Sequence, residues 1–217
     1  MIKPAITLAF AVLLLGGCKT HLSPSTVPHY GFTETKQFHA NATVGFNGIE
    51  AQMAVSTTDN IYVSAYYQGV KYSQTSRFRM YGLGGGLYSP INKRGRFSTG
   101  IELFYGNVGL RNITNPNYNR DQVFRFLANM SLGTEFKLFE FYTGMRMGNY
   151  SYWRMPNARE MAFRFEPNAT LKIGLGKCKM FGQVGLSIPT SGWNDLIPMA
   201  QLGIQIETFK KPSKNRE

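Results

Sequence analysis

The sequence predicts an all-β fold, an antiparallel up-and-down transmembrane β-barrel of about ten strands. Apolar and polar residues alternate with a period of two along most of the chain, and this is the period of a β-strand. After residues 1–17, no apolar run approaches the roughly 18 residues that a membrane-spanning helix needs. The remaining chain, about 200 residues, is long enough for one all-β domain of ordinary size.

The clearest alternation lies between residues 123 and 138. In an extended chain, one face of this stretch carries seven apolar residues of eight, and the opposite face carries two of eight. A helix would mix the two sets, whereas a strand keeps them on separate faces. This stretch is therefore predicted as a strand with one apolar and one polar face.

Nine further stretches alternate in the same way. Asn47-Gly48, between the first two of them, is a strong hairpin signal. Between Gly82 and Gly86 the alternation is interrupted, so we expect a bulge or a tight bend there. In chain order, these further strands are predicted over 37–46, 49–55, 61–67, 77–88, 97–106, 139–148, 163–175, 180–188 and 200–208.

Alternation alone fits two kinds of closed barrel, because the apolar face points inward in a soluble barrel and outward in a membrane barrel. Aromatic residues bracket the apolar faces here, as Phe97 and Tyr105 do, and eight to ten tilted residues span roughly 20–25 Å. The opposite faces carry glycine and charges of both signs, which suits a narrow polar lumen. We therefore expect the apolar faces to meet lipid. The lumenal charge network is predicted to contain Glu102, Arg125, Glu135, Arg146, Arg164, Glu166 and Lys172.

The N-terminus has the features of an export signal. Lys3 precedes a short apolar stretch, and the small residues Gly16 and Gly17 precede Cys18. A cysteine directly after Leu-Gly-Gly resembles the lipobox of bacterial lipoproteins. The resemblance implies that Cys18 is acylated, with palmitate among the expected acyl groups, and becomes the mature N-terminus. The predicted regions are a signal peptide over 1–17, a flexible tether over 18–36 with packing only around Tyr30 to Phe32, the barrel over 37–209, and a basic tail over 210–217.

The connections between the predicted strands differ in length on the two sides of the barrel. Over 37–209 this pattern resembles small bacterial outer-membrane β-barrel proteins, whose short turns face the periplasm. The resemblance implies that loops 110–121 and 150–162 are exposed outside the cell. An even strand count would place both termini on the periplasmic side, with the lipid anchor in the periplasmic leaflet. The short connections are 57–60, 137–139 and 176–178, and the longer ones are 70–76, 110–121, 150–162 and 189–197.

The net charge of +12 indicates that this protein contacts a partner or membrane surface that carries negative charge. An exported protein rarely meets nucleic acid, so outer-membrane lipid and lipopolysaccharide are the expected contacts, and a partner membrane protein stays open. Arginine binds phosphate in a bidentate way, which suits lipopolysaccharide, although a simple solvated positive rim explains the pattern equally well. The predicted rim residues are Arg77, Arg79, Arg111, Arg120, Arg154 and Arg159.

No group of residues predicts catalysis, a metal site or a cofactor. The only histidines are His21, His29 and His39, none with a metal-like partner, and the loop residues Asp121 and Asp195 have no histidine near them in sequence. The leading expectation is a non-enzymatic outer-membrane β-barrel lipoprotein with a structural, surface-binding or accessory-subunit role. The alternatives are a periplasm-facing lipoprotein with a soluble lipocalin-like barrel for an apolar ligand, and a lipid-modifying barrel enzyme.

Overall fold

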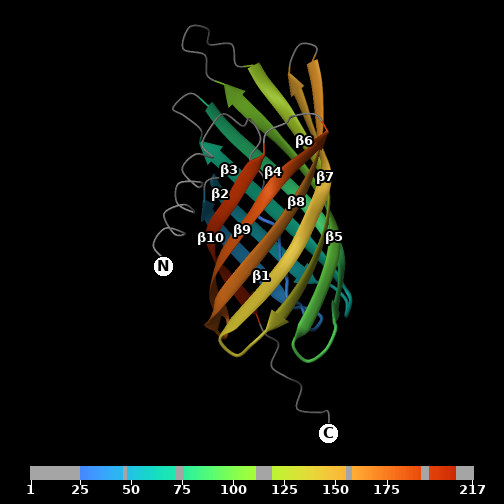
Figure 1. Cartoon of the computed structure of the whole chain (residues 1–217), viewed down its shortest axis with the longest axis vertical. Helices are drawn as coiled ribbons and strands as arrows, with labels where there is room; N and C mark the ends of the chain where they lie inside the picture. Colours follow the sequence, from blue (N-terminus) through green and yellow to red (C-terminus); the bar gives the residue numbers. More distant parts are fainter. Residues whose placement is uncertain are drawn as a thin grey trace, which may run out of the picture.

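The computed structural model describes residues 25–45, 48–71, 76–110, 119–154, 158–191 and 196–208. These residues form ten strands in one closed antiparallel barrel, in which each strand pairs with its neighbours in sequence and β1 pairs with β10 (Figure 1). The predicted ten-stranded up-and-down barrel is therefore confirmed. Within the described part of the chain, no helix is long and apolar enough to cross a membrane.

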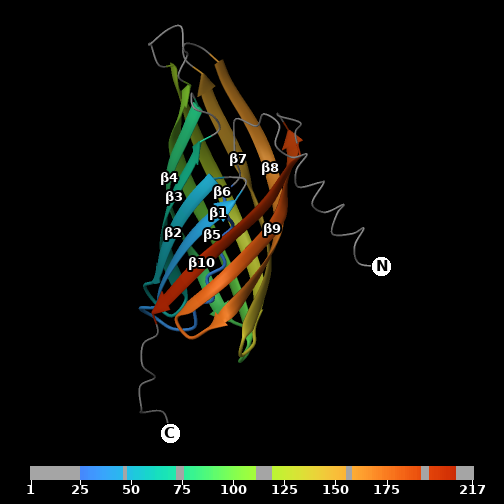
Figure 2. The same ribbon diagram turned by 90° about the vertical axis from the view of Figure 1, so that its left-hand side faces the viewer.

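The strands differ twofold in length. β1 and β2 have 8 and 9 residues, whereas β6 and β8 have 17 and 18. The turns after β2, β4, β6 and β8 are short and lie at one end. At the other end, where β1 joins β2, the long strands rise beyond β1 and β2 (Figure 2). In this article these are the short-turn end and the long-loop end. The strands are β1 Phe38–Gly45, β2 Gly48–Ser56, β3 Ile61–Lys71, β4 Ser76–Pro90, β5 Gly95–Leu110, β6 Asn119–Glu135, β7 Phe139–Arg154, β8 Ala158–Leu175, β9 Cys178–Ser191 and β10 Ile197–Thr208.

The outer wall is apolar and the inner wall is largely polar. Leu83 and Leu202 are each 69% exposed, whereas the charged side chains of Arg125 and Arg146 are fully buried inside the barrel. A soluble barrel would show the reverse distribution, so the alternative of a soluble barrel with an apolar interior is wrong. An apolar exterior around a polar interior is the distribution of a transmembrane β-barrel. Outward apolar side chains include Val44, Ile49, Met53, Ile101, Leu103, Leu132, Phe141, Ile173, Val184 and Ile204.

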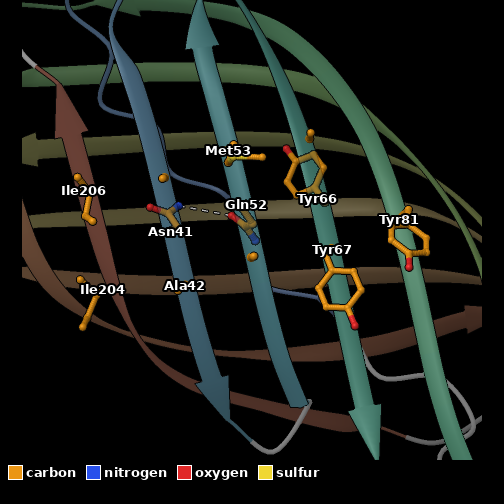
Figure 3. A pocket seen from close by; sticks show the side chains of 12 residues that line it. Asn41, Ala42, Gln52, Met53, Tyr66, Tyr67, Tyr81, Ile204 and Ile206 are labelled. Carbon is orange, nitrogen blue, oxygen red and sulfur yellow. Dashed lines mark hydrogen bonds between the residues drawn. The ribbon is translucent and has the colours of Figure 1, made fainter.

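A broad hollow lies on the outer wall over β1 to β4 and β10. Four alanines, at positions 40, 42, 51 and 65, leave a groove of about 620 Å³ beside larger side chains such as Tyr67 and Tyr81 (Figure 3). In the same view Asn41 donates a hydrogen bond to Gln52 on the lumenal face. The groove is almost entirely apolar and open to the side, so hydrocarbon chains of the surrounding lipid can fill it.

The predicted bulge between Gly82 and Gly86 is wrong. β4 pairs without a register shift with both β3 and β5 through these glycines. The interruption of the pattern has a packing reason, because Gly82, Gly84 and Gly86 occupy lumenal positions where larger neighbours need room. A Cβ at Gly82 would lie 2.5 Å from a ring carbon of Phe104. The register shift occurs instead between Phe163 and Arg164, where β8 pairs with β9.

Two predicted tight turns are confirmed by their backbone geometry. Gly48 begins β2 with a φ of 98°, and Gly176 joins β8 to β9 with a φ of 67°. Both values lie in the left-handed region, which glycine adopts without steric strain. Gly48 and Gly176 therefore stand at hairpin connections that the sequence indicates, while Asn47 lies outside the described residues.

Candidate functional site: the occupied lumen

The barrel lumen is occupied by the chain that precedes β1. Residues 25–37, here called the lumenal segment, run from the interior of the barrel to the short-turn end, and Val27, His29, Tyr30 and Phe32 are each at most 3% exposed. The expected flexible tether is therefore wrong for this described part, in which burial extends from Ser25 to Phe32 and is not limited to Tyr30–Phe32. The sequence gives no periodic signal here because the segment forms no strand.

The chain reverses direction at the short-turn end to join the lumenal segment to the wall. Lys36 has a φ of 63°, a rare conformation for a residue other than glycine, and its N–H donates to the Ser56 carbonyl at 2.8 Å. The Gln37 side chain accepts hydrogen bonds from the N–H groups of Thr33 and Glu34. These contacts fix the point at which the chain leaves the lumen and begins β1.

Side chains of the wall satisfy the backbone of the lumenal segment. The Gln183 amide accepts from the Val27 N–H at 3.0 Å and donates to the Val27 carbonyl at 2.9 Å, as a neighbouring strand would. The Thr26 N–H donates to Glu50 at 2.6 Å, and Lys172 Nζ donates to the His29 carbonyl at 2.6 Å. Buried backbone groups need such partners, so the wall is built to hold this segment.

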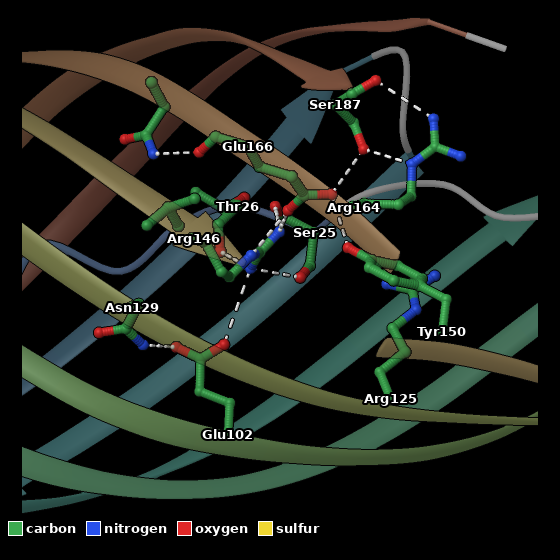
Figure 4. Close-up of polar contacts among 12 residues, drawn as sticks. Ser25, Thr26, Glu102, Arg125, Asn129, Arg146, Tyr150, Arg164, Glu166 and Ser187 are labelled. Atoms are coloured by element: carbon green, nitrogen blue, oxygen red, sulfur yellow. Dashed lines mark hydrogen bonds and ion pairs between the residues drawn. The ribbon is translucent and has the colours of Figure 1, made fainter. Parts of the chain in front are cut away.

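Arg146 lies at the centre of the lumenal charge network. Its Nε and Nη2 donate to Glu166 Oε2 at 2.8 and 2.6 Å, and its Nη1 lies 3.7 Å from Glu102 Oε2. The same guanidinium donates to the Ser25 hydroxyl at 2.8 Å and to the Ser25 carbonyl at 2.6 Å (Figure 4). One buried cation thus joins β5, β7 and β8 to the lumenal segment.

The two carboxylates that face Arg146 have further partners. Glu166 accepts from Tyr150 Oη at 2.6 Å and from Ser187 Oγ at 2.7 Å. Glu102 accepts from Tyr66 Oη at 3.1 Å and from Asn129 Nδ2 at 2.5 Å. The buried charges are therefore embedded in a hydrogen-bond network rather than left as isolated ions.

The other predicted lumenal charges lie around this centre. Arg125 is fully buried, with its guanidinium 4.8 Å from the Tyr150 ring centroid. Arg164 donates to Ser187 Oγ at 2.7 Å. Glu135 differs from the rest because it is only half-buried, at the short-turn end, where it pairs with Arg96 at 2.8 Å.

A second charged group near the short-turn end is not anticipated by the sequence pattern. Lys179 contacts Glu140 and lies 2.8 Å from Glu207, and Lys172 lies 3.9 Å from Glu140. The ammonium group of Lys179 thus turns toward the two lumenal carboxylates. The sequence does hold a signal for this group, because Glu140 in β7 and Glu207 in β10 lie on the polar faces of their strands and therefore point into the lumen.

Aromatic clusters fill the lumen on both sides of the charged centre. Toward the short-turn end, Tyr30 and Phe32 of the lumenal segment pack with Tyr62 and Tyr88. Toward the long-loop end, eight buried side chains from β3 to β7 form a second cluster. Its members are Tyr66, Phe78, Met80, Phe104, Val123, Leu127, Tyr150 and Tyr152.

Only part of the predicted arginine rim can be placed. Arg79 and Arg159 are exposed on the outer wall, and the Arg159 guanidinium lies 5.6 Å from the Trp153 ring centroid. Arg111 lies outside the described residues, as do the side chains of Arg77, Arg120 and Arg154. Cys18, the predicted lipidation site, lies outside them as well. The bounds of the two predicted external loops are wrong, because residues 110, 119–121, 150–154 and 158–162 belong to strands, and the remaining residues 111–118 and 155–157 lie outside the described part of the chain.

The histidines inside the barrel take part in ordinary hydrogen bonds. His29 Nε2 lies 2.7 Å from Asn168 Oδ1, and His39 Nδ1 lies 3.0 Å from Gln205 Nε2. In the part of the chain that the structure describes, no three or more histidine, cysteine or acidic residues are grouped so that they could hold a metal ion.

Comparison with known proteins gives a distant structural likeness. Neither a family model nor a curated protein matches the sequence. One solved structure that matches is the NanC porin in a rhombohedral crystal form, at 16% sequence identity and a TM-score of 0.35. The match covers 81% of this chain and 99% of that chain. A likeness this remote assigns no function.

Proposed function

We propose that this protein is a non-enzymatic outer-membrane β-barrel lipoprotein, closed by its own lumenal segment, with a structural, surface-binding or accessory-subunit role. The observation that carries the proposal is the combination of an apolar outer wall with a polar lumen that is already occupied. A closed barrel satisfies every backbone hydrogen bond between strands, and this allows β-strands to cross a bilayer. Closed barrels with these two faces are typical of bacterial outer membranes.

The described lumenal groups support a closing role better than transport or catalysis. The side chains of Arg146, Gln183 and Glu50 bind the lumenal segment. A substrate in the lumen would have to displace these contacts. We therefore propose no catalytic site and no cofactor, and we place the function on the outer surfaces and the ends of the barrel.

The proposed contacts are membrane lipids and, at the long-loop end, lipopolysaccharide. Exposed Arg79 and the exposed pair of Arg159 and Trp153 support this contact, because arginine binds phosphate and tryptophan favours the membrane interface. A partner membrane protein is the second proposed kind of contact. The lipobox-like sequence before Cys18 supports a lipid anchor there.

The membrane location is tested by separate substitutions of two neighbouring residues in β6, one facing outward and one facing the lumen. Met130 faces outward at mid-height, whereas Ser131 faces the lumen and bonds Ser98 at 2.7 Å. Met130→Arg is expected to lower the free energy of unfolding by about 2–4 kcal/mol in lipid vesicles, because it places a charge in hydrocarbon. Ser131→Ala, the matched control, removes one hydrogen bond and should lower it by about 1 kcal/mol.

The free energy of unfolding is measured by urea unfolding in vesicles. The fraction of folded protein at each urea concentration is read from gels, on which a folded barrel shows a heat-modifiable shift in migration. Met130→Leu should behave as the native protein, because leucine keeps the apolar volume. Equal tolerance of Met130→Arg and Met130→Leu would reject the membrane barrel.

A further inference from the structure

We infer that the chain preceding Ser25 leaves the barrel at the long-loop end, so that the lumenal segment threads the barrel and presents Cys18 on the outer side of the membrane. The inference rests on the proposed function, because it takes the barrel to span the outer membrane with its short turns in the periplasm. It assigns a side of the membrane to the proposed lipid, and this side is opposite to the one expected from the even number of strands.

The direction of the lumenal segment is defined by its contacts. Glu34 lies at the short-turn end, where its carbonyl accepts hydrogen bonds from Ser56 and Tyr88. Farther from the reversal at Lys36, His29 reaches Asn168, and Ser25 reaches Arg146 in the middle of β7. Followed from Lys36 back toward Ser25, the chain therefore climbs from the short-turn end to mid-lumen and points toward the long-loop end.

The return path to the short-turn end is filled. Between Ser25 and the reversal, the lumen holds the segment itself, and Val27, Tyr30 and Phe32 are almost completely buried. Even a single Cβ at Gly31 would collide with Tyr142 and lie 2.7 Å from Glu135 Oε1. A second stretch of chain cannot run back beside the first through a space this tightly packed.

The wall ends close to Ser25 at the long-loop end. Thr26 contacts Glu50 and Thr43. Glu50 is two residues from the start of β2, and Thr43 is two residues from the end of β1. Because β1 and β2 are short, with eight and nine residues, the barrel wall is lowest on their side. The first described residues of the chain lie on that same side. The long strands β6 and β8 form the high side, where the second aromatic cluster lies.

Chain length permits this exit. Seven peptide units separate Ser25 from Cys18, and an extended chain covers at most about 3.3–3.6 Å per residue, or about 23–25 Å in all. Thr43 and Glu50, which contact Thr26, are each only two residues from the ends of their strands, so a chain of this length is sufficient to pass the low wall and reach the neighbouring leaflet. Acyl chains on Cys18 would then enter the outer leaflet, and the protein would carry its N-terminus on the cell surface.

The test labels single cysteines on intact cells with a membrane-impermeant maleimide. All variants carry Cys178→Ser, and the parent without an added cysteine should not react, since an acylated Cys18 has no free thiol. Ser23→Cys is expected to react on intact cells, as is Asn157→Cys in the loop between β7 and β8. Lys177→Cys, in the turn at the short-turn end, should react only after the outer membrane is permeabilised.

The outcomes separate the inference from the proposed function. Reaction of Ser23→Cys on intact cells together with Asn157→Cys supports threading. If Asn157→Cys reacts and Ser23→Cys does not, threading is overturned while the orientation of the barrel stands. If Asn157→Cys fails and Lys177→Cys reacts on intact cells, or if neither does, the proposed outer-membrane topology itself is rejected. A reactive parent, with an unacylated N-terminus by mass spectrometry, rejects the lipid, and the threading test is then repeated with Cys18→Ser added to every variant.

Discussion

Arg146 shows at the scale of one residue how the lumen is held together. Its guanidinium pairs with Glu166 and Glu102 and also binds the backbone of Ser25. Removing one partner of a buried ion network leaves the others without compensation, which is more damaging than losing an exposed pair.

We predict that Arg146→Met lowers the free energy of unfolding by about 3–5 kcal/mol, because Glu166 and the Ser25 carbonyl lose their buried donor. Urea unfolding in lipid vesicles measures the change. Arg94→Met is the control, since Arg94 is exposed in a short turn and should tolerate the change. A loss of less than about 1 kcal/mol for Arg146→Met would contradict the central role of this side chain.

At this scale the sequence predicts the face of a side chain better than its partners. Strict alternation places Glu102, Arg146 and Glu166 on the lumenal faces, where the structure also has them. The pairing of Arg146 with Glu166 depends on the register between β7 and β8, which alternation leaves undefined. The Ser25 contact depends on a segment without periodicity and is therefore invisible to the pattern.

At the scale of elements, the strands and the lumenal segment obey different rules. A strand can be predicted from the alternation of apolar and polar residues, because its two faces meet different surroundings. The lumenal segment is surrounded by the wall on all sides and is bound mainly through its backbone, as the pair of hydrogen bonds from Gln183 to Val27 illustrates. Its side chains therefore need no alternation, and the sequence resembles a tether.

The outward arginines of β4 and β8 allow a prediction about lipopolysaccharide binding. Arg159→Ala, combined with Arg79→Ala, should reduce the lipopolysaccharide that co-purifies with the protein in mild detergent by at least about half, because arginine binds phosphate in a bidentate way. Arg94→Ala is the matched control, since Arg94 also lies over an aromatic ring, 5.6 Å from the Phe136 centroid, but at the short-turn end. Equal amounts in all variants would show that the outward arginines are only a solvated rim.

At the scale of the whole molecule, the barrel differs from an open pore. The lumenal segment fills the middle and the short-turn half, and the second aromatic cluster fills part of the long-loop half. A barrel of ten strands has a narrow interior, so these side chains leave little continuous water.

We predict that the native protein forms no steady ion-conducting channels in planar lipid bilayers. A general porin in the same preparation serves as the positive control for insertion, and a heat-modifiable band confirms that this protein is folded. Steady, reproducible conductance steps from the folded protein would show that the lumenal segment leaves an open path.

The pairing of β1 with β10, here called the seam, closes the barrel around the lumenal segment, and this affects how the protein can assemble. The residues joined across it, such as Phe38 and Thr208, are 170 positions apart, so this contact closes almost the whole of the described chain into a loop. Because the lumenal segment is continuous with β1, the N-terminal end that we propose to be acylated could not pass through a barrel that is already closed and tightly packed. With threading as inferred above, we therefore expect seam formation and enclosure of the segment to occur together. On this view the segment is an internal template around which the barrel closes, and we expect no empty barrel to be released into the membrane.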